Sequence, residues 1–227
     1  MTVFLAVWLL AISSPIPSLN VQTIVRDLEA RYHHAATLKA AFLERYKQGG
    51  ETTQIESGTV YFEHPGKMRW EYESPEKKLF LVDGKNVWFY VPRDRTASRA
   101  KLKDSADWRT PFALLTGSMN LNRLCGRVTL APADQAADTY PVGALDRVLR
   151  CFPGDSAEKA GFDEVRLVLN PDNQLEDVVV FQAGGIETDF QFGSWEENLP
   201  LPEVLFHFEP PVGVAIVDEQ ALLGEVH

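Results

Sequence analysis

The sequence has little that would mark a nucleic-acid-binding or metal-binding protein. It carries 22 Lys and Arg residues against 32 Asp and Glu residues, which gives a formal net charge of −10. Such a chain is not drawn to a phosphate backbone by long-range attraction, so we expect no nucleic-acid partner. The two cysteines form no Cys-x-x-Cys pair, and the five histidines lack the i,i+4 spacing of a metal site. We therefore expect no metal and no cofactor.

The sequence also lacks a catalytic motif in the right context. Gly154-Asp155-Ser156 resembles part of a serine-hydrolase motif, but it follows Pro153 in a loop, without the strand-to-helix turn that exposes such a nucleophile. No glycine-rich loop that could cradle a phosphate is present. An exported esterase that acts on acyl chains is the enzyme to consider, yet the sequence favours a binding protein over an enzyme.

Charge is absent from the N-terminal segment, where the first charged side chain is Arg26. The apolar run Val3–Ile12 is much shorter than the roughly 20 residues of a membrane span, and two prolines follow it. We expect residues 1–18 to be a signal peptide, although no Lys or Arg follows Met1, and residues 19–227 to form a single domain. The alternative is that the apolar run is the first element of that domain.

Only two cysteines occur, Cys125 and Cys151, and neither lies near the expected cleavage site. An exported chain allows a disulfide between them, which in the chain-entropy model would stabilise the fold by about 3 kcal/mol. Two buried free thiols are the alternative.

Apolar residues recur every three or four positions from Ile24 to Tyr32, which predicts an amphipathic helix over residues 20–34, capped by Ser18 or Asn20. Beyond it the pattern has period two, with turn residues between short runs, which is typical of an antiparallel meander. The predicted strands cover residues 38–47, 54–63, 67–73, 78–83, 86–91, 98–102, 125–131, 146–152, 162–169, 175–182, 187–194, 203–209 and 213–217.

Two further features decide the fold class. Thr110-Pro111 begins a short inserted helix, which with residues 118–124 would make a helical pair that has one apolar face. The runs 79–82 and 87–91 hardly alternate, so both of their faces must be sheltered. We therefore predict a mainly β, α+β fold: an incomplete, strongly curved antiparallel half-barrel whose hydrophobic cavity lies under a helical lid.

Several segments resemble the LolA family of outer-membrane lipoprotein carriers. They are GTVYFEHPGKMRWEYESP from Gly58, then LFLVDGKNVWFYVP up to Pro92, TPFALLTGS at 110–118 and FHFEPPVGVAIVDE at 206–219. Their order and spacing match the family over most of the chain, with 125–165 the least distinctive part. The resemblance implies a monomeric periplasmic chaperone that accepts acylated lipoproteins from an inner-membrane ABC transporter and hands them to an outer-membrane acceptor. A periplasmic sensor of lipids or lipoproteins with the same fold is the alternative.

Strand parity gives the candidate wall residues and helical spacing gives the candidate lid residues, and any of the wall residues could instead be ordinary core. The predicted wall of the acyl-chain cavity is Phe42, Val60, Phe62, Met68, Trp70, Leu79, Leu81, Phe190 and Phe192. The predicted lid residues are Leu28, Tyr32, Phe112, Leu115 and Met119.

One position departs from the family pattern. Before the Pro-Gly turn the family usually has Arg or Lys, which latches the lid, whereas this chain has His64. A histidine is shorter and is often neutral near pH 7. His64 could still donate one hydrogen bond, or the nearby Lys67 or Arg69 could take over, so the candidate latch residues are His64 and Arg69.

Overall fold

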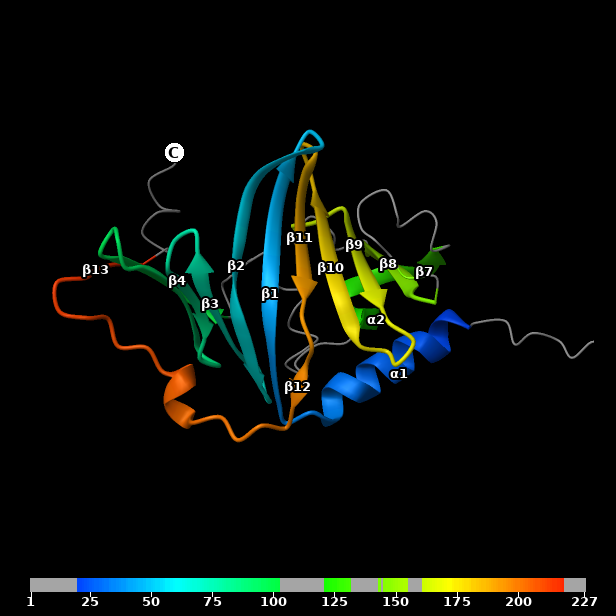
Figure 1. Ribbon diagram of the computed structural model, residues 1–227, viewed down its shortest axis with the longest axis horizontal. Coiled ribbons are helices and arrows are strands. Elements are labelled where there is room, and N and C mark those ends of the chain that lie inside the picture. The colour runs from blue at the N-terminus through cyan, green and yellow to red at the C-terminus, as the bar shows by residue number, and fades with distance from the viewer. Residues whose placement is uncertain (1–19, 103–120, 132–142, 144, 155–160, 219–227) are drawn as a thin grey trace, which may run out of the picture.

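The structure is a computed structural model that describes residues 20–102, 121–131, 143, 145–154 and 161–218. It is mainly β, and one long sheet contains all thirteen described strands (Figure 1). The elements are α1 (Val21–His34), β1 (Thr37–Gln48), β2 (Glu51–Glu63), β3 (Lys67–Ser74), β4 (Lys78–Val82), β5 (Asn86–Val91), β6 (Thr96–Lys101), α2 (Leu121–Leu124), β7 (Cys125–Ala131), β8 (Arg147–Pro153), β9 (Glu164–Leu169), β10 (Leu175–Gln182), β11 (Ile186–Phe192), β12 (Glu196–Glu197), the 3₁₀ turn η4 (Glu203–Phe206) and β13 (Ala215–Asp218).

The sheet consists of two antiparallel meanders joined by their long strands. The strand order is β13-β6-β5-β4-β3-β2-β1-β11-β10-β9-β8-β7, with β12 on β1 and with β13 parallel to β6. β1 therefore pairs with both β2 and β11, which lie far apart in the sequence. The sheet curves strongly and α1 crosses its lower end in Figure 1, which confirms the predicted curved antiparallel fold.

The first helix forms where the apolar spacing predicts it. Asn20 is the N-cap, because its side-chain oxygen accepts a hydrogen bond of 2.9 Å from the backbone N–H of Gln22. The apolar side of α1 is buried against one face of the sheet, from Ile24 to Tyr32. We call this the inner face and the opposite one the outer face. The predicted helix after Thr110 lies outside the described residues, and of the predicted pair only α2 is described.

Most predicted strands are present within a few residues, but the one at 203–209 is wrong. The chain instead forms η4, in which Leu205 and His207 donate backbone hydrogen bonds to the carbonyl groups three residues earlier. Prolines 202, 210 and 211 flank this segment, and since proline has no N–H it disfavours a continuous strand ladder. The short strand β12 was not predicted.

Both faces of β4 are buried, as the missing alternation predicted. Phe80 and Val82 belong to the large inner cluster together with α1. Leu79 and Leu81 belong to a smaller outer cluster with Trp88 and with the segment around η4. The inner cluster is the core, and the outer cluster fastens the C-terminal segment to the sheet.

Candidate functional site

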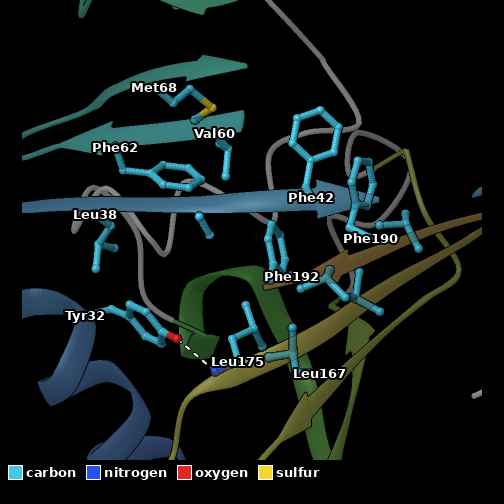
Figure 2. Packing of buried hydrophobic residues seen from close by; sticks show 14 of the residues in the cluster. Tyr32, Leu38, Phe42, Val60, Phe62, Met68, Leu167, Leu175, Phe190 and Phe192 are labelled. Atoms are coloured by element: carbon cyan, nitrogen blue, oxygen red, sulfur yellow. Dashed lines mark hydrogen bonds between the residues drawn. The ribbon is translucent and has the colours of Figure 1, made fainter. Parts of the chain in front are cut away.

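Aromatic rings gather on the inner face around Trp70, which is fully buried. Its indole lies 4.9 Å from the ring of Phe42 and 5.3 Å from the ring of Phe190, measured between centroids. Three strand spacings separate β3 from β11, about 14 Å in a flat sheet. The short contact between Trp70 and Phe190 therefore reflects the curvature of the sheet. Figure 2 shows other members of this cluster, among them Phe42, Phe62 and Phe190, together with Tyr32 from α1.

Strand register brings most of the predicted wall residues together. Val60 pairs with Trp70 and Phe62 with Met68 across β2 and β3, while Phe42 pairs with Phe192 across β1 and β11. Seven of the nine predicted residues therefore lie in one buried cluster. They are Phe42, Val60, Phe62, Met68, Trp70, Phe190 and Phe192.

The other two predicted wall residues, Leu79 and Leu81, lie on the outer face. Trp70 pairs with Phe80, so that Phe80 and not its neighbours continues the inner row. The parity prediction was wrong here because β4 is apolar on both faces, and alternation carries no information in such a strand. The inner positions of β4 are held by Phe80 and Val82.

Helix α1 covers the lower end of the inner face with its buried apolar residues. Leu28 and Tyr32 are both fully buried there, in the cluster that contains the predicted wall. The other predicted lid residues, Phe112, Leu115 and Met119, lie outside the described residues. α1 is also linked to α2, because the Glu29 carboxylate accepts a hydrogen bond of 2.7 Å from the backbone N–H of Leu121.

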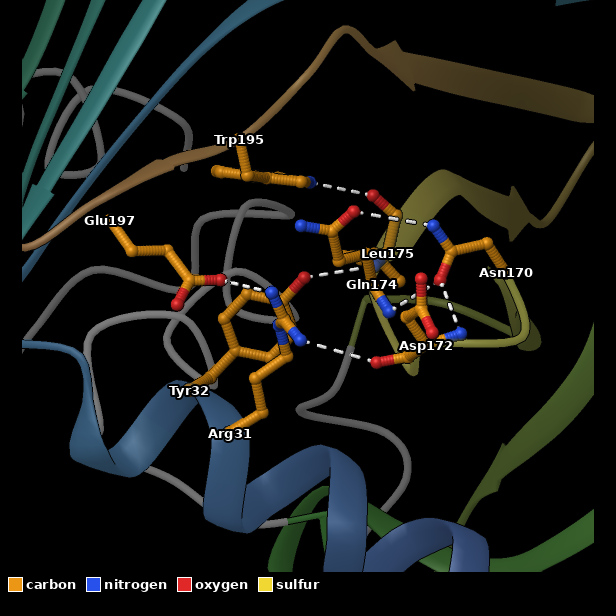
Figure 3. Close-up of polar contacts among 8 residues, drawn as sticks. All are labelled: Arg31, Tyr32, Asn170, Asp172, Gln174, Leu175, Trp195 and Glu197. Carbon is orange, nitrogen blue, oxygen red and sulfur yellow. Dashed lines mark hydrogen bonds and ion pairs between the residues drawn. The ribbon is translucent and has the colours of Figure 1, made fainter.

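The C-terminal end of α1 is anchored through the backbone of Leu175 (Figure 3). The Leu175 N–H donates to the Tyr32 hydroxyl at 2.8 Å, and its carbonyl accepts from the Trp195 indole N–H at 2.7 Å. Pairing of β10 with β11 begins only at Asp177, opposite Gln191, and at Leu175 side chains bond both backbone groups instead. Burial raises the pKa of Tyr32, so its hydroxyl stays neutral.

Arg31 adds a second anchor beside Tyr32. Its guanidinium forms an ion pair with Glu197 on β12 and donates to the backbone carbonyl of Asp172 at 3.2 Å. Sequence analysis did not identify Arg31, Trp195 or Glu197 as site residues. A charged residue on an amphipathic helix normally predicts a solvent-exposed side chain, and nothing in the pattern indicates that β12 would lie beside it.

The two candidate latch residues lie in different places. His64 directly follows β2, its backbone N–H donates to the Ala36 carbonyl at 3.0 Å, and its ring lies 6.2 Å from that of His33 on the last turn of α1. Arg69 points to the outer face, where it bonds Glu71 at 2.6 Å and the Leu205 carbonyl at 2.8 Å. Arg69 therefore fastens the C-terminal segment, and these contacts of its side chain give no support to its prediction as a lid latch.

Covalent and membrane features complete the description of the site. A disulfide joins Cys125 on β7 to Cys151 on β8, and both cysteines are buried in the inner cluster. Among the described residues, no three His, Cys, Asp or Glu side chains are grouped so as to hold a metal ion. The described helices include none with the length and apolar character needed to cross a membrane.

Comparisons with known proteins agree with this architecture. The family model "Outer membrane lipoprotein carrier protein LolA" matches residues 33–209. An outer-membrane lipoprotein carrier protein of Dechloromonas aromatica (strain RCB) is 31% identical over 205 residues, covering 90% of this chain and 92% of that protein. A counterpart from Methylobacillus flagellatus is 27% identical and covers 95% and 99% of the two chains. An uncharacterized conserved protein from Thermus thermophilus has the same fold, with a TM-score of 0.52 at 16% identity, and covers 87% of this chain and 98% of its own. This chain thus belongs to the LolA family of outer membrane lipoprotein carrier proteins.

Proposed function

We propose that this protein carries acylated lipoproteins through the periplasm, with their acyl chains held on the inner face beneath α1. The observation that carries the proposal is the buried aromatic cluster around Trp70, which also contains the apolar side of α1 and, among the described residues, no catalytic group. Residues 1–18 would direct export and be removed. We propose no enzymatic activity.

The chemistry of the cargo requires such a carrier. Exposing one methylene to water costs about 0.8 kcal/mol, so two or three acyl chains cost tens of kcal/mol in total. A site that recovered all of this free energy would not release the cargo. In the empty protein the Leu28 and Tyr32 side chains cover the inner face, so displacing them from it subtracts from the affinity for acyl chains.

The partners follow from this role. An inner-membrane lipoprotein-releasing ABC transporter would supply the cargo, and an outer-membrane acceptor would receive it. The His64 ring lies near the last turn of α1, so His64 would help to hold this helix in place. A His64→Leu variant that accepts and releases cargo normally would remove His64 from the mechanism.

A release assay tests the carrier function. Purified protein is added to spheroplasts that contain labelled lipoprotein and the matching transporter, and the soluble fraction is analysed for a one-to-one complex. We expect a soluble complex whose formation depends on ATP. If the folded protein leaves all lipoprotein in the membrane, the carrier proposal fails and a sensor of lipids or lipoproteins becomes the better account.

A further inference from the structure

The inner face changes from apolar to polar along the strands β1 to β4. On β1 the inward row begins with Leu38, continues through Ala40 and Phe42, and reaches Glu44, which is buried. Register places Glu44 opposite Glu56 on β2 and places Tyr72 opposite Lys78 across β3 and β4. The apolar end of these rows lies toward α1, and the polar end lies toward the β1–β2 hairpin (Figure 1).

The four polar residues at this level form two bonded pairs that meet where Lys78 lies beside the Tyr72 ring. The Tyr72 hydroxyl donates to a Glu44 carboxylate oxygen at 2.8 Å. Lys78 forms an ion pair with Glu56, and its ammonium lies 5.3 Å from the centroid of the Tyr72 ring. Glu44 and Glu56 are only 9% and 8% exposed, so these charges are largely removed from water. We call Glu44, Glu56, Tyr72 and Lys78 the polar stop.

Beyond the polar stop the inner surface formed by the described residues is poorly suited to hydrocarbon. The next space measures about 60 Å³ and is lined by Glu44, Tyr46, Gln54 and Glu56. A methylene chain that entered it would separate buried charged groups from their partners and would provide no hydrogen bond in exchange. Extension in this direction is therefore unfavourable, in contrast to contact with the aromatic wall.

We propose that the polar stop limits the length of the acyl chain that the inner face of β1–β4 accepts. This inference rests on the proposed carrier function. From Leu38 to Phe42 the apolar wall extends over four residue spacings, about 14 Å. The limit applies to chains that lie on β1–β4, because β10 and β11 present the apolar Val178, Val180 and Phe190 to the same interior.

A chain-length series tests the polar stop. Binding of N-acyl peptides with chains of about eight to about eighteen carbons is measured for the purified full chain by isothermal titration. Affinity should rise by up to about four-fold per added methylene, the value for burying one CH₂ group, and then reach a plateau. In the variant Glu56→Leu/Lys78→Leu, which removes both charges together, the plateau should move to chains at least about two carbons longer.

Two control variants separate the polar stop from general effects. Lys47→Leu/Glu187→Leu removes an ion pair of similar burial between strands β1 and β11, and its plateau should stay where it is in the wild type. The exchanged pair Glu56→Lys/Lys78→Glu keeps the polarity and should also leave the plateau unchanged. If Glu56→Leu/Lys78→Leu does not fold by circular dichroism, the milder Glu56→Gln/Lys78→Met takes its place.

The outcomes distinguish the two proposals. An unchanged plateau in a folded variant without the Glu56–Lys78 charges would overturn the polar stop and leave the carrier function standing. Absence of binding at every chain length in the wild type would instead refute the carrier function. A plateau that moves equally in the Lys47/Glu187 control would show that the shift comes from altered stability, and would also overturn the polar stop.

Discussion

The two faces of β4 carry apolar side chains of similar size but are covered in different ways. The inner residues Phe80 and Val82 lie in the cluster with α1. The outer residues Leu79 and Leu81 lie under the C-terminal segment that contains Phe206. The C-terminal segment on the outer side is held through Leu205 and through β13, whereas α1 meets the inner cluster through apolar side chains and has polar links at Glu29, Arg31 and Tyr32.

The C-terminal segment and α1 are attached to the sheet in different ways. This difference explains why only the inner face is suited to exchange its contacts with the protein for contacts with acyl chains. On the outer side, Arg69 binds the Leu205 carbonyl, and the chain then continues into β13, which pairs with β6. On the inner side, α1 is held by individual side-chain bonds of Tyr32 and Arg31 in its last turn and of Glu29 one turn earlier. A ladder of backbone hydrogen bonds is costly to open, but apolar contacts of a helix can be replaced by acyl chains at little net cost.

We expect a single substitution at Gly58 to disrupt the packing on both the inner and the outer face of the sheet. A Cβ atom at Gly58 on β2 would lie 1.8 Å from the Glu71 carbonyl oxygen on β3. The register between β2 and β3 shifts at this position. We expect Gly58→Ala to lower the free energy of unfolding by about 4 kcal/mol or more, measured by urea denaturation. Gly193→Ala is the control, since its Cβ would meet only ordinary contacts at 3.6 Å. A loss below about 1 kcal/mol for Gly58→Ala would contradict the close approach of β2 and β3 at this position.

Two leucines of equal burial sharpen the comparison between the faces. Leu38 on the inner face and Leu81 on the outer face are 1% and 0% exposed. We expect Leu38→Ala and Leu81→Ala each to cost about 2–5 kcal/mol of unfolding free energy. Only Leu38→Ala should change the affinity for N-acyl peptides. Equal effects of both substitutions on this affinity would contradict the account in which acyl chains replace the contacts on the inner face while the C-terminal segment stays on the outer face.

Two aspartates, Asp177 and Asp83, should make the free energy of unfolding change with pH in opposite directions. Burial raises the pKa of Asp177 to about 7, with help from Asp189 and Glu176. Because its unfolded value is about 3.9, the folded state holds this proton more tightly, and stability should fall as pH rises from about 4 to about 7. Asp177→Asn should remove this fall and raise the unfolding free energy at pH 8 by about 1–2 kcal/mol, measured by denaturant titration.

Asp83 is the matched control for the pH experiment. Burial opposes its ionisation, but hydrogen bonds from Asn86, Lys85 and Trp88 outweigh burial and lower its pKa. Its stabilising effect is present above about pH 4 and is lost as pH falls through the lowered value. Asp83→Asn should therefore weaken the fold at pH 7 and leave the slope between pH 4 and 7 in place. A slope that persists in Asp177→Asn would assign it to another group.

Tyr32 gives the smallest expected change and tests the anchor of α1. Tyr32→Phe removes the acceptor of the Leu175 N–H, which should lower the unfolding free energy by about 1 kcal/mol. Because the anchored state competes with cargo, the same variant should bind N-acyl peptides more tightly. Weaker binding in a folded Tyr32→Phe protein would show that the hydroxyl supports the bound state instead.

The sequence was sufficient to predict the elements whose pattern has one clear period. The helix α1 follows from the spacing of Ile24 to Tyr32 and from its cap, and the inward positions of Phe42 on β1 and of Val60 and Phe62 on β2 follow from strand parity. The face of each residue in β4 could not be predicted, because four successive apolar residues fit either parity. The strand predicted at 203–209 failed because apolar content alone does not tell a strand from a covering segment between prolines.

The anchors of α1 depend on tertiary contacts that no local pattern contains. Trp195 and Tyr32 meet at Leu175, which lies before the first pair of β10 with β11, Asp177 with Gln191. The outward direction of Arg69 follows from the alternation that places Met68 and Trp70 inward, but its partner, the Leu205 carbonyl, depends on the path of the C-terminal segment, which local sequence does not fix. Contacts between segments far apart in the sequence therefore determine the partners of Tyr32, Trp195 and Arg69.

Fluorescence quenching tests the central claim, that acyl chains bind on the inner face, most directly. Trp70 and Trp195 belong to the inner cluster, whereas Trp88 belongs to the outer one. An N-acyl peptide with a brominated chain is titrated into the wild type and into the variants Trp70→Phe, Trp195→Phe and Trp88→Phe. We expect the quenched amplitude to fall in Trp70→Phe and Trp195→Phe and to stay unchanged in Trp88→Phe. Quenching that disappears with Trp88 and persists without Trp70 and Trp195 would contradict the account.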